Sequence, residues 1–221
     1  MRSPDGSPGA TGVRPRVDRG IRLPKSEHTF RPWRIHEISS DFRLLDVWAL
    51  PTPGGPDDFP RLVRQFAEGD TSSNPSRLAR ALFTIRWKLG ELFGWDNPEH
   101  GVGSRVPTLR ARLPVDLRDG PSGPEFDGLP FVPIYLTDTE WASEIANRTV
   151  HGILHLGWVR DGAGGYRGQM AVLVKPNGLL GEAYMGAISP FRHLVVYPPL
   201  VREIGQEWRR AAHEPRRADV C

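Results

Sequence analysis

Apolar residues in the second half of the chain form short runs separated by turn signals, which is typical of β-strands joined in hairpins. Strands are predicted over Phe131–Leu136, Thr149–Val159 and Tyr166–Lys175, because these runs are rich in β-branched and aromatic residues. The segment Arg160–Gly165 contains Asp-Gly and joins the last two strands as a hairpin. Phe42–Leu50 is a further strand and ends at a cluster of Pro and Gly. The chain is therefore predicted to build a twisted antiparallel sheet.

The segment Thr137–Asn147 allows two interpretations. Thr137 and Glu140 have the spacing of a capping box, which favours a short helix. Thr137–Thr139 is also suited to a hairpin turn, which would lead into a strand over Trp141–Arg148. We favour the strand, because it fits the family plan described below.

Helical periodicity marks several other segments. Leu200, Ile204 and Trp208 share one face, so the C-terminal helix is expected to bury a stripe against the sheet. The remaining expected helices are Phe59–Ala67, a long helix between the N-cap Asn74 and Gly94, and two segments over Leu179–Ile188 and Phe191–Tyr197. Between these parts, residues 95–130 are expected to form exposed loop with an edge strand over Thr108–Leu117.

Composition sets the limits of the domain. The segments 1–28 and 209–221 lack apolar periodicity and are expected to be a disordered arm and a disordered tail, which leaves one α+β domain over residues 29–208. The formal net charge is +3, but basic residues are in excess only in the two tails. The domain therefore lacks the basic surface expected of a nucleic-acid-binding protein.

Known sequence templates exclude several other classes. The single cysteine, Cys221, permits neither an intrachain disulfide nor a cysteine-based metal cluster. The N-terminus has no apolar core of the signal-peptide kind, and no run approaches the ~20 apolar residues of a membrane span, so a cytoplasmic protein without membrane partners is expected. Phosphate-binding, dinucleotide-binding and nucleophile-elbow motifs are missing, so no cofactor is expected. His151 and His155 stand about 13 Å apart on one strand and cannot share a metal ion.

Two polar features of the strands bear on function. Asp46 interrupts an apolar strand, and a carboxylate there either points outward, which we favour, or finds a buried partner. His151 follows Glu140 and Glu144, and a neighbouring antiparallel strand would place one of these carboxylates opposite the imidazole. A histidine–carboxylate pair is suited to general acid–base chemistry, so His151 and Glu144 are the candidate catalytic residues. The alternative is that the two histidines, His151 and His155, only cover the outer face of the sheet or hydrogen-bond to local backbone groups.

The C-terminal third resembles a known family. The motif Pro176-x-Gly178-Leu179-x-Gly181, followed by Tyr184 and Pro190, resembles a bacterial domain of unknown function that occurs alone or after short-chain-dehydrogenase-like domains. The segments 38–55 and 140–159 are similar to the same family. That family is similar in plan to the START-like helix-grip superfamily, in which a strand, two helices, several antiparallel strands and a long C-terminal helix enclose a cavity. The resemblance implies this fold here, and it implies no catalytic residues.

A helix-grip cavity implies a protein that binds a hydrophobic metabolite, or a cofactor-independent cyclase, dehydratase or isomerase. The candidate ligand-binding residues are Tyr135, Asn147, His155, Trp158, Tyr184 and His193. The alternative function is a non-catalytic module that docks on another protein or forms a homodimer.

The strand Thr149–Val159 leaves open which of its faces meets the cavity. One face carries Val150, Leu154, Leu156 and Trp158, and the other carries His151, Ile153, His155 and Val159. A shift of one residue exchanges the two sets. We predict that the face with His151 meets the cavity, within reach of Glu144 or Tyr135.

Overall fold

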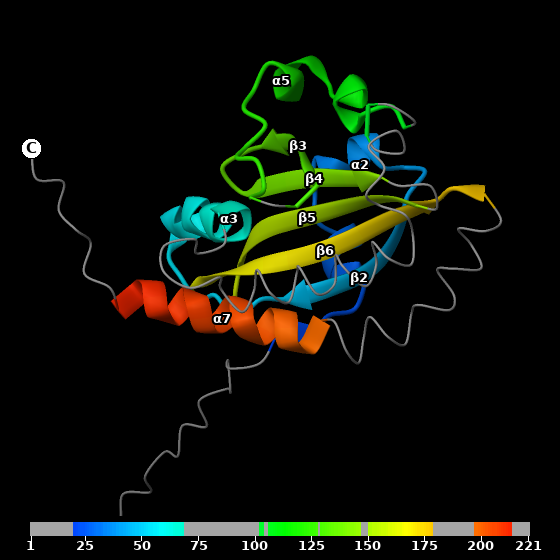
Figure 1. Ribbon diagram of the computed structural model, residues 1–221. Helices are drawn as coiled ribbons and strands as arrows, with labels where there is room; N and C mark the ends of the chain where they lie inside the picture. The colour runs from blue at the N-terminus through cyan, green and yellow to red at the C-terminus, as the bar shows by residue number, and fades with distance from the viewer. Residues whose placement is uncertain are drawn as a thin grey trace, which may run out of the picture.

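The predicted hairpin strands form the centre of one six-stranded antiparallel sheet, which has helices on both faces (Figure 1). The computed structural model describes residues 20–68, 102–103, 106–127, 129–146, 150–178 and 197–213. The strands are β1 Ile21–Arg22, β2 Arg43–Ala49, β3 Val132–Leu136, β4 Glu140–Ala146, β5 Val150–Arg160 and β6 Tyr166–Pro176. Their order across the sheet is β1-β2-β6-β5-β4-β3. The helical elements are α1 Ser26–Thr29, α2 Ile35–Ile38, η1 Pro56–Asp58, α3 Phe59–Glu68, η3 Leu109–Arg112, α5 Val115–Arg118 and α7 Tyr197–His213.

Side-chain hydrogen bonds stabilise the turn between β3 and β4 and the turn between β5 and β6. Asp161 accepts hydrogen bonds from the backbone N–H groups of Ala163 and Gly165 in the turn between β5 and β6. Gly164 has a φ of 89°, a left-handed conformation that glycine adopts without a steric penalty. In the turn between β3 and β4, the Thr137 hydroxyl accepts from the N–H of Glu140 at 2.9 Å. The capping-box contact is therefore made in a turn, and the strand interpretation of the following segment is confirmed.

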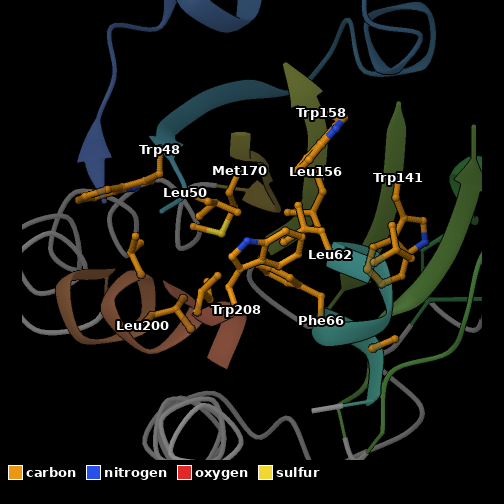
Figure 2. Close-up of a cluster of buried hydrophobic side chains, with 14 of the residues drawn as sticks. Trp48, Leu50, Leu62, Phe66, Trp141, Leu156, Trp158, Met170, Leu200 and Trp208 are labelled. Carbon is orange, nitrogen blue, oxygen red and sulfur yellow. The ribbon is translucent and has the colours of Figure 1, made fainter. Parts of the chain in front are cut away.

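Alternation along β5 separates two apolar layers. Leu156 and Trp158 pack beneath α3 and α7 with Met170 of β6 and Trp208 of α7 (Figure 2). Ile153 points to the opposite face. There it packs with a second layer that contains Trp33, Ile35, Ile38, Leu109, Leu113 and Leu117. The sheet is thus covered by α3 and α7 on one face and by α1, α2, η3 and α5 on the other.

Helix α7 is longer than predicted at both ends. It begins at Tyr197, and Pro198 and Pro199 occupy its first turn, where a missing N–H costs no intrahelical hydrogen bond. Leu200, Ile204 and Trp208 are all buried, so the predicted apolar stripe is confirmed. The helix continues to His213, so its last turn occupies part of the segment expected to be a disordered tail.

The expected N-terminal arm is wrong for residues 20–28. Ile21 and Arg22 pair with Ala49 and Trp48 of β2, which extends the sheet by one short strand. His28 has no exposed surface. The segment enters the fold because its polar and charged side chains find partners there, which apolar periodicity does not detect.

Two further expectations need correction. No strand forms over 108–117; the short helical elements η3 and α5 lie there, and Leu109, Leu113 and Leu117 are buried. Asp46 does not point into solvent: it is 1% exposed and forms an ion pair with Arg22 at 3.2 Å. The expected helices between Asn74 and Gly94, over Leu179–Ile188 and over residues 191–196 lie outside the described residues.

Candidate functional site

Two buried glutamate–histidine pairs lie side by side on the face of the sheet opposite α7. The register of β4 and β5 pairs Ala142 with His155 and Ala146 with His151, so Glu140 and Glu144 lie diagonally across from the two histidines. All four side chains project to the same face, because they occupy alternate positions of antiparallel strands. The sequence-predicted pair is therefore assembled by strand register.

Glu140 is the centre of the first network. Its carboxylate accepts from the Tyr135 hydroxyl at 2.8 Å and from Nε2 of His155 at 3.3 Å. The backbone N–H of Arg34 donates to both of its oxygens, at 3.1 and 3.0 Å. Beyond His155, Nε2 of His28 lies 3.2 Å from Nδ1 of the imidazole. A chain of four side chains thus connects β3, β4, β5 and α1.

The charges of this network follow from burial and hydrogen bonding. Burial raises the pKa of Glu140, but hydrogen bonds from His155, Arg34 and Tyr135 outweigh it and hold that pKa below its usual value. Burial lowers the pKa of His155, although Glu140 opposes the shift. Burial and the neighbouring His155 lower the pKa of His28 to about 2. The network therefore holds an ionised carboxylate beside two neutral imidazoles.

Neutral imidazoles fix the positions of the protons. His155 donates from Nε2 to Glu140, so its Nδ1 is an acceptor and receives the Nε2–H of His28. Nδ1 of His28 is then a bare acceptor, and it has no hydrogen-bond partner among the described residues. The imidazole of His36 meets that of His28 edge to face, with ring centroids 4.9 Å apart.

Glu144 is the centre of the second network. Nε2 of His151 lies 2.7 Å from the carboxylate, and the N–H of Leu109 donates to both carboxylate oxygens at 3.0 and 3.2 Å. The hydroxyl of Thr108 donates to one of the same oxygens. Phe42 covers His151, with ring centroids 5.0 Å apart. The carboxylate thus anchors the start of η3 to the sheet.

The predicted site residues do not form one cluster. His151 contacts Glu144, whereas Tyr135 contacts Glu140 and belongs to the other network. Trp158 lies on the opposite face, where its indole N–H donates to the carbonyl of Gly55 at 2.9 Å. Asn147, Tyr184 and His193 lie outside the described residues. The described part of the chain contains no group of three His, Cys, Asp or Glu side chains that could hold a metal ion.

A second feature lies on the α7 face, and sequence reasoning missed it. Asp46, Val172, Leu154 and Ser143 occupy one row across β2, β6, β5 and β4. Ser143 is 1% exposed, yet its hydroxyl has no hydrogen-bond partner among the residues that the structure describes. The alternation of β4 places Ser143 on the face of Trp141, and this period of two was the available signal.

The middle of that row is less covered than the part of the same face that lies beneath α3 and α7. Leu154 and Val172 are half-buried, although both lie on central strands. Their neighbours on the same face, Leu156 and Met170, are buried under α3 and α7. Leu154 and Val172 therefore leave some apolar surface exposed between the polar side chains of Asp46 and Ser143, and we call these four residues the row.

Sequence comparison places the chain in a family. Residues 38–199 match the family described as "Protein of unknown function (DUF2867)", and the chain belongs to that family. No curated protein and no solved structure matches the chain. None of the described helices is both long and apolar enough to cross a membrane.

Proposed function

We propose that this member of the DUF2867 family binds a small hydrophobic molecule on the α7 face of its sheet, above Leu154 and Val172. The observation that carries the proposal is the half-buried state of these two side chains on central strands. Ligand sites are mostly apolar and contain a few placed polar groups. The row has this composition, because Asp46 and Ser143 flank two aliphatic side chains.

The connectivity supports the same proposal. The first long strand, β2, pairs with the last, β6, and β3 to β6 follow one another as antiparallel neighbours. Helix α3 follows β2, and α7 ends the described fold on the same face as α3. This order agrees with the helix-grip plan of the START-like superfamily, in which the ligand lies between the sheet and the C-terminal helix. The row lies on that face.

An acid–base reaction at His151 and Glu144 is less well supported than binding. Both side chains lie on the face away from α7, and Glu144 already accepts hydrogen bonds from Thr108, Leu109 and His151. A substrate could reach this carboxylate only after η3 had moved. Its geometry favours a role in holding η3 on the sheet.

A protein-docking module is also less well supported. The exposed large apolar side chains among the described residues are Ile21, Phe30, Val115 and Val132. Ile21 and Val132 belong to β1 and β3, the two opposite edges of the sheet. Because two of the four side chains lie at opposite edges, the four do not form one contiguous apolar patch of the kind that marks an interface.

Fluorescence titration with the neutral dye N-phenyl-1-naphthylamine tests the proposal. We expect the wild-type protein to bind the dye with enhanced emission, and Leu154→Trp to weaken binding by roughly tenfold, or ~1.4 kcal/mol. Leu44→Trp is the matched control, because Leu44 is also half-buried but packs on the opposite face. Equal affinity in the wild type and both variants would contradict the proposal.

A further inference from the structure

The hydroxyl of Ser143 is an unusual group to find in an apolar layer. Ser143 lies between Trp141 and Ile145 on the α7 face of β4, opposite Leu154 of β5 and Pro133 of β3. A buried hydroxyl without a partner destabilises a folded protein, because it gives up its hydrogen bonds to water and gains none in return. Sheet residues in such positions are ordinarily apolar. The unfavourable free energy of burying this hydroxyl is not offset by a hydrogen bond to any of the described residues.

We infer that Ser143 is the polar anchor of the ligand site, and that the ligand carries a neutral carbonyl or hydroxyl oxygen on an otherwise apolar skeleton. This inference rests on the proposed function. A serine hydroxyl both donates and accepts, so it satisfies either oxygen group. The surroundings of Ser143 are apolar, which disfavours a charged group at this end because burial of an unpaired charge is costly.

The row also sets the size of the ligand. Ser143 and Asp46 are three strand spacings apart, about 14 Å at ~4.8 Å per spacing. Leu154 and Val172 fill the interval with aliphatic surface. A molecule with its oxygen at Ser143 therefore extends its apolar part along the row towards β2. The ion pair between Asp46 and Arg22 closes the far end.

Competition with the bound dye tests the anchor. The two competitors are 2-acetylnaphthalene and 2-ethylnaphthalene, which have the same ring and differ by a carbonyl oxygen. In the wild type the ketone is expected to gain a hydrogen bond to Ser143. The ratio of the two dissociation constants is therefore expected to change by about fivefold in Ser143→Ala, in favour of the hydrocarbon. Because solvation of the competitors is the same for both proteins, the change in ratio isolates the side chain.

Ser39→Ala is the matched control. Ser39 is also buried, but on the opposite face, and its hydroxyl donates to the carbonyl of Ile35 at 2.8 Å. The ratio is expected to stay at the wild-type value in this variant. Without ligand, Ser143→Ala is expected to melt at the wild-type temperature or above, whereas Ser39→Ala is expected to melt below it. Ser143→Cys, which keeps the size of the side chain, is expected to give an intermediate ratio.

The outcomes distinguish a failure of the Ser143 anchor from a failure of the proposed binding site. An unchanged ratio in Ser143→Ala, with the dye still displaced, overturns the anchor and leaves the binding site intact. A marked loss of stability in ligand-free Ser143→Ala also overturns it, because the hydroxyl would then have a structural partner. Failure of the dye to bind the wild type, or equal binding by Leu154→Trp, overturns the proposed function and the anchor together.

Discussion

His28 and His155 are separated by 127 positions in the sequence, and their imidazoles lie within hydrogen-bond distance at 3.2 Å. Both side chains are fully buried, and the rings meet edge to face. This contact attaches α1 to the middle of β5, on the same face of the sheet as Glu140. Its stability depends on both imidazoles remaining neutral.

Acid is expected to weaken the fold in a defined pH range. The pKa of His28 falls from 6.5 in the unfolded chain to about 2 in the folded protein, so the unfolded state binds more protons between these values. The free energy of unfolding therefore decreases as the pH falls below 6.5, by about 1.4 kcal/mol per pH unit for this one group. His155 and Glu140 act in the same direction, because the folded protein lowers the pKa of each.

His28→Gln tests this assignment. Glutamine can donate to Nδ1 of His155 but does not titrate, so the slope between pH 4 and 6 is expected to be shallower than that of the wild type by about one proton. The measurement is urea denaturation at a series of pH values. Parallel slopes for the two proteins would show that His28 is already protonated in the fold.

Glu144→Gln is expected to destabilise the protein by about 2–3 kcal/mol, because the carboxylate loses hydrogen bonds of the charged type. An amide NH₂ group in the same place would also face a backbone N–H donor, that of Leu109. Chemical denaturation measures the loss, and dye binding by the folded variant is expected to be unchanged. Glu37→Gln is the control: Glu37 pairs with Arg34 at the surface, and its loss is expected to cost at most ~1 kcal/mol. A wild-type midpoint for Glu144→Gln would refute the anchoring role.

Gly157 and Gly152 of β5 lie on opposite faces of the sheet, and an alanine at each position tests how closely side chains pack on that face. A Cβ atom at Gly157 would lie 2.7 Å from Cη2 of Trp33, so Gly157→Ala is expected to displace the indole at a cost of about 1–3 kcal/mol. At Gly152 the nearest atom would be Cγ2 of Ile145 at 3.4 Å, an ordinary contact. Gly152→Ala is therefore expected to be neutral or stabilising by up to ~1 kcal/mol. Thermal denaturation compares the two, and equal melting temperatures would contradict the packing of Trp33 on β5.

Trp208→Ala is expected to cost about 3–5 kcal/mol, since the indole is 2% exposed and fills the layer beneath α7. The variant also loses the hydrogen bond from the indole N–H to the carbonyl of Pro53 at 2.9 Å. Trp208→Phe keeps most of the apolar surface and is expected to lose less. Denaturant titration with far-UV circular dichroism measures both losses, and similar midpoints for the two variants would argue against the close packing of this side chain.

Local sequence determined the elements that form from neighbouring residues. The strands β5 and β6 and the turn between them follow from β-branched and aromatic runs around Asp161-Gly162, and the apolar stripe of α7 follows from its 3.6-residue period. These elements depend on contacts between residues that are close in the sequence, and such contacts require a regular spacing of apolar and turn residues. The elements could therefore be predicted without knowledge of the fold.

Only the tertiary structure decided which helices pack on each face of those strands. The alternation of β5 defined two sets of side chains, but only the packing of α3 and α7 assigned Leu156 and Trp158 to one layer and His151 and His155 to the other. Alternation along β4 indicated the face on which Ser143 lies, but neither the burial of His28 nor the lack of a hydrogen-bond partner for Ser143 among the described residues had a local signal. A polar residue in a short segment gives no sign of whether a residue more than a hundred positions away will pair with it. Burial of polar groups is a property of long-range packing, and periodicity along the chain carries no information about which distant segment covers a given face.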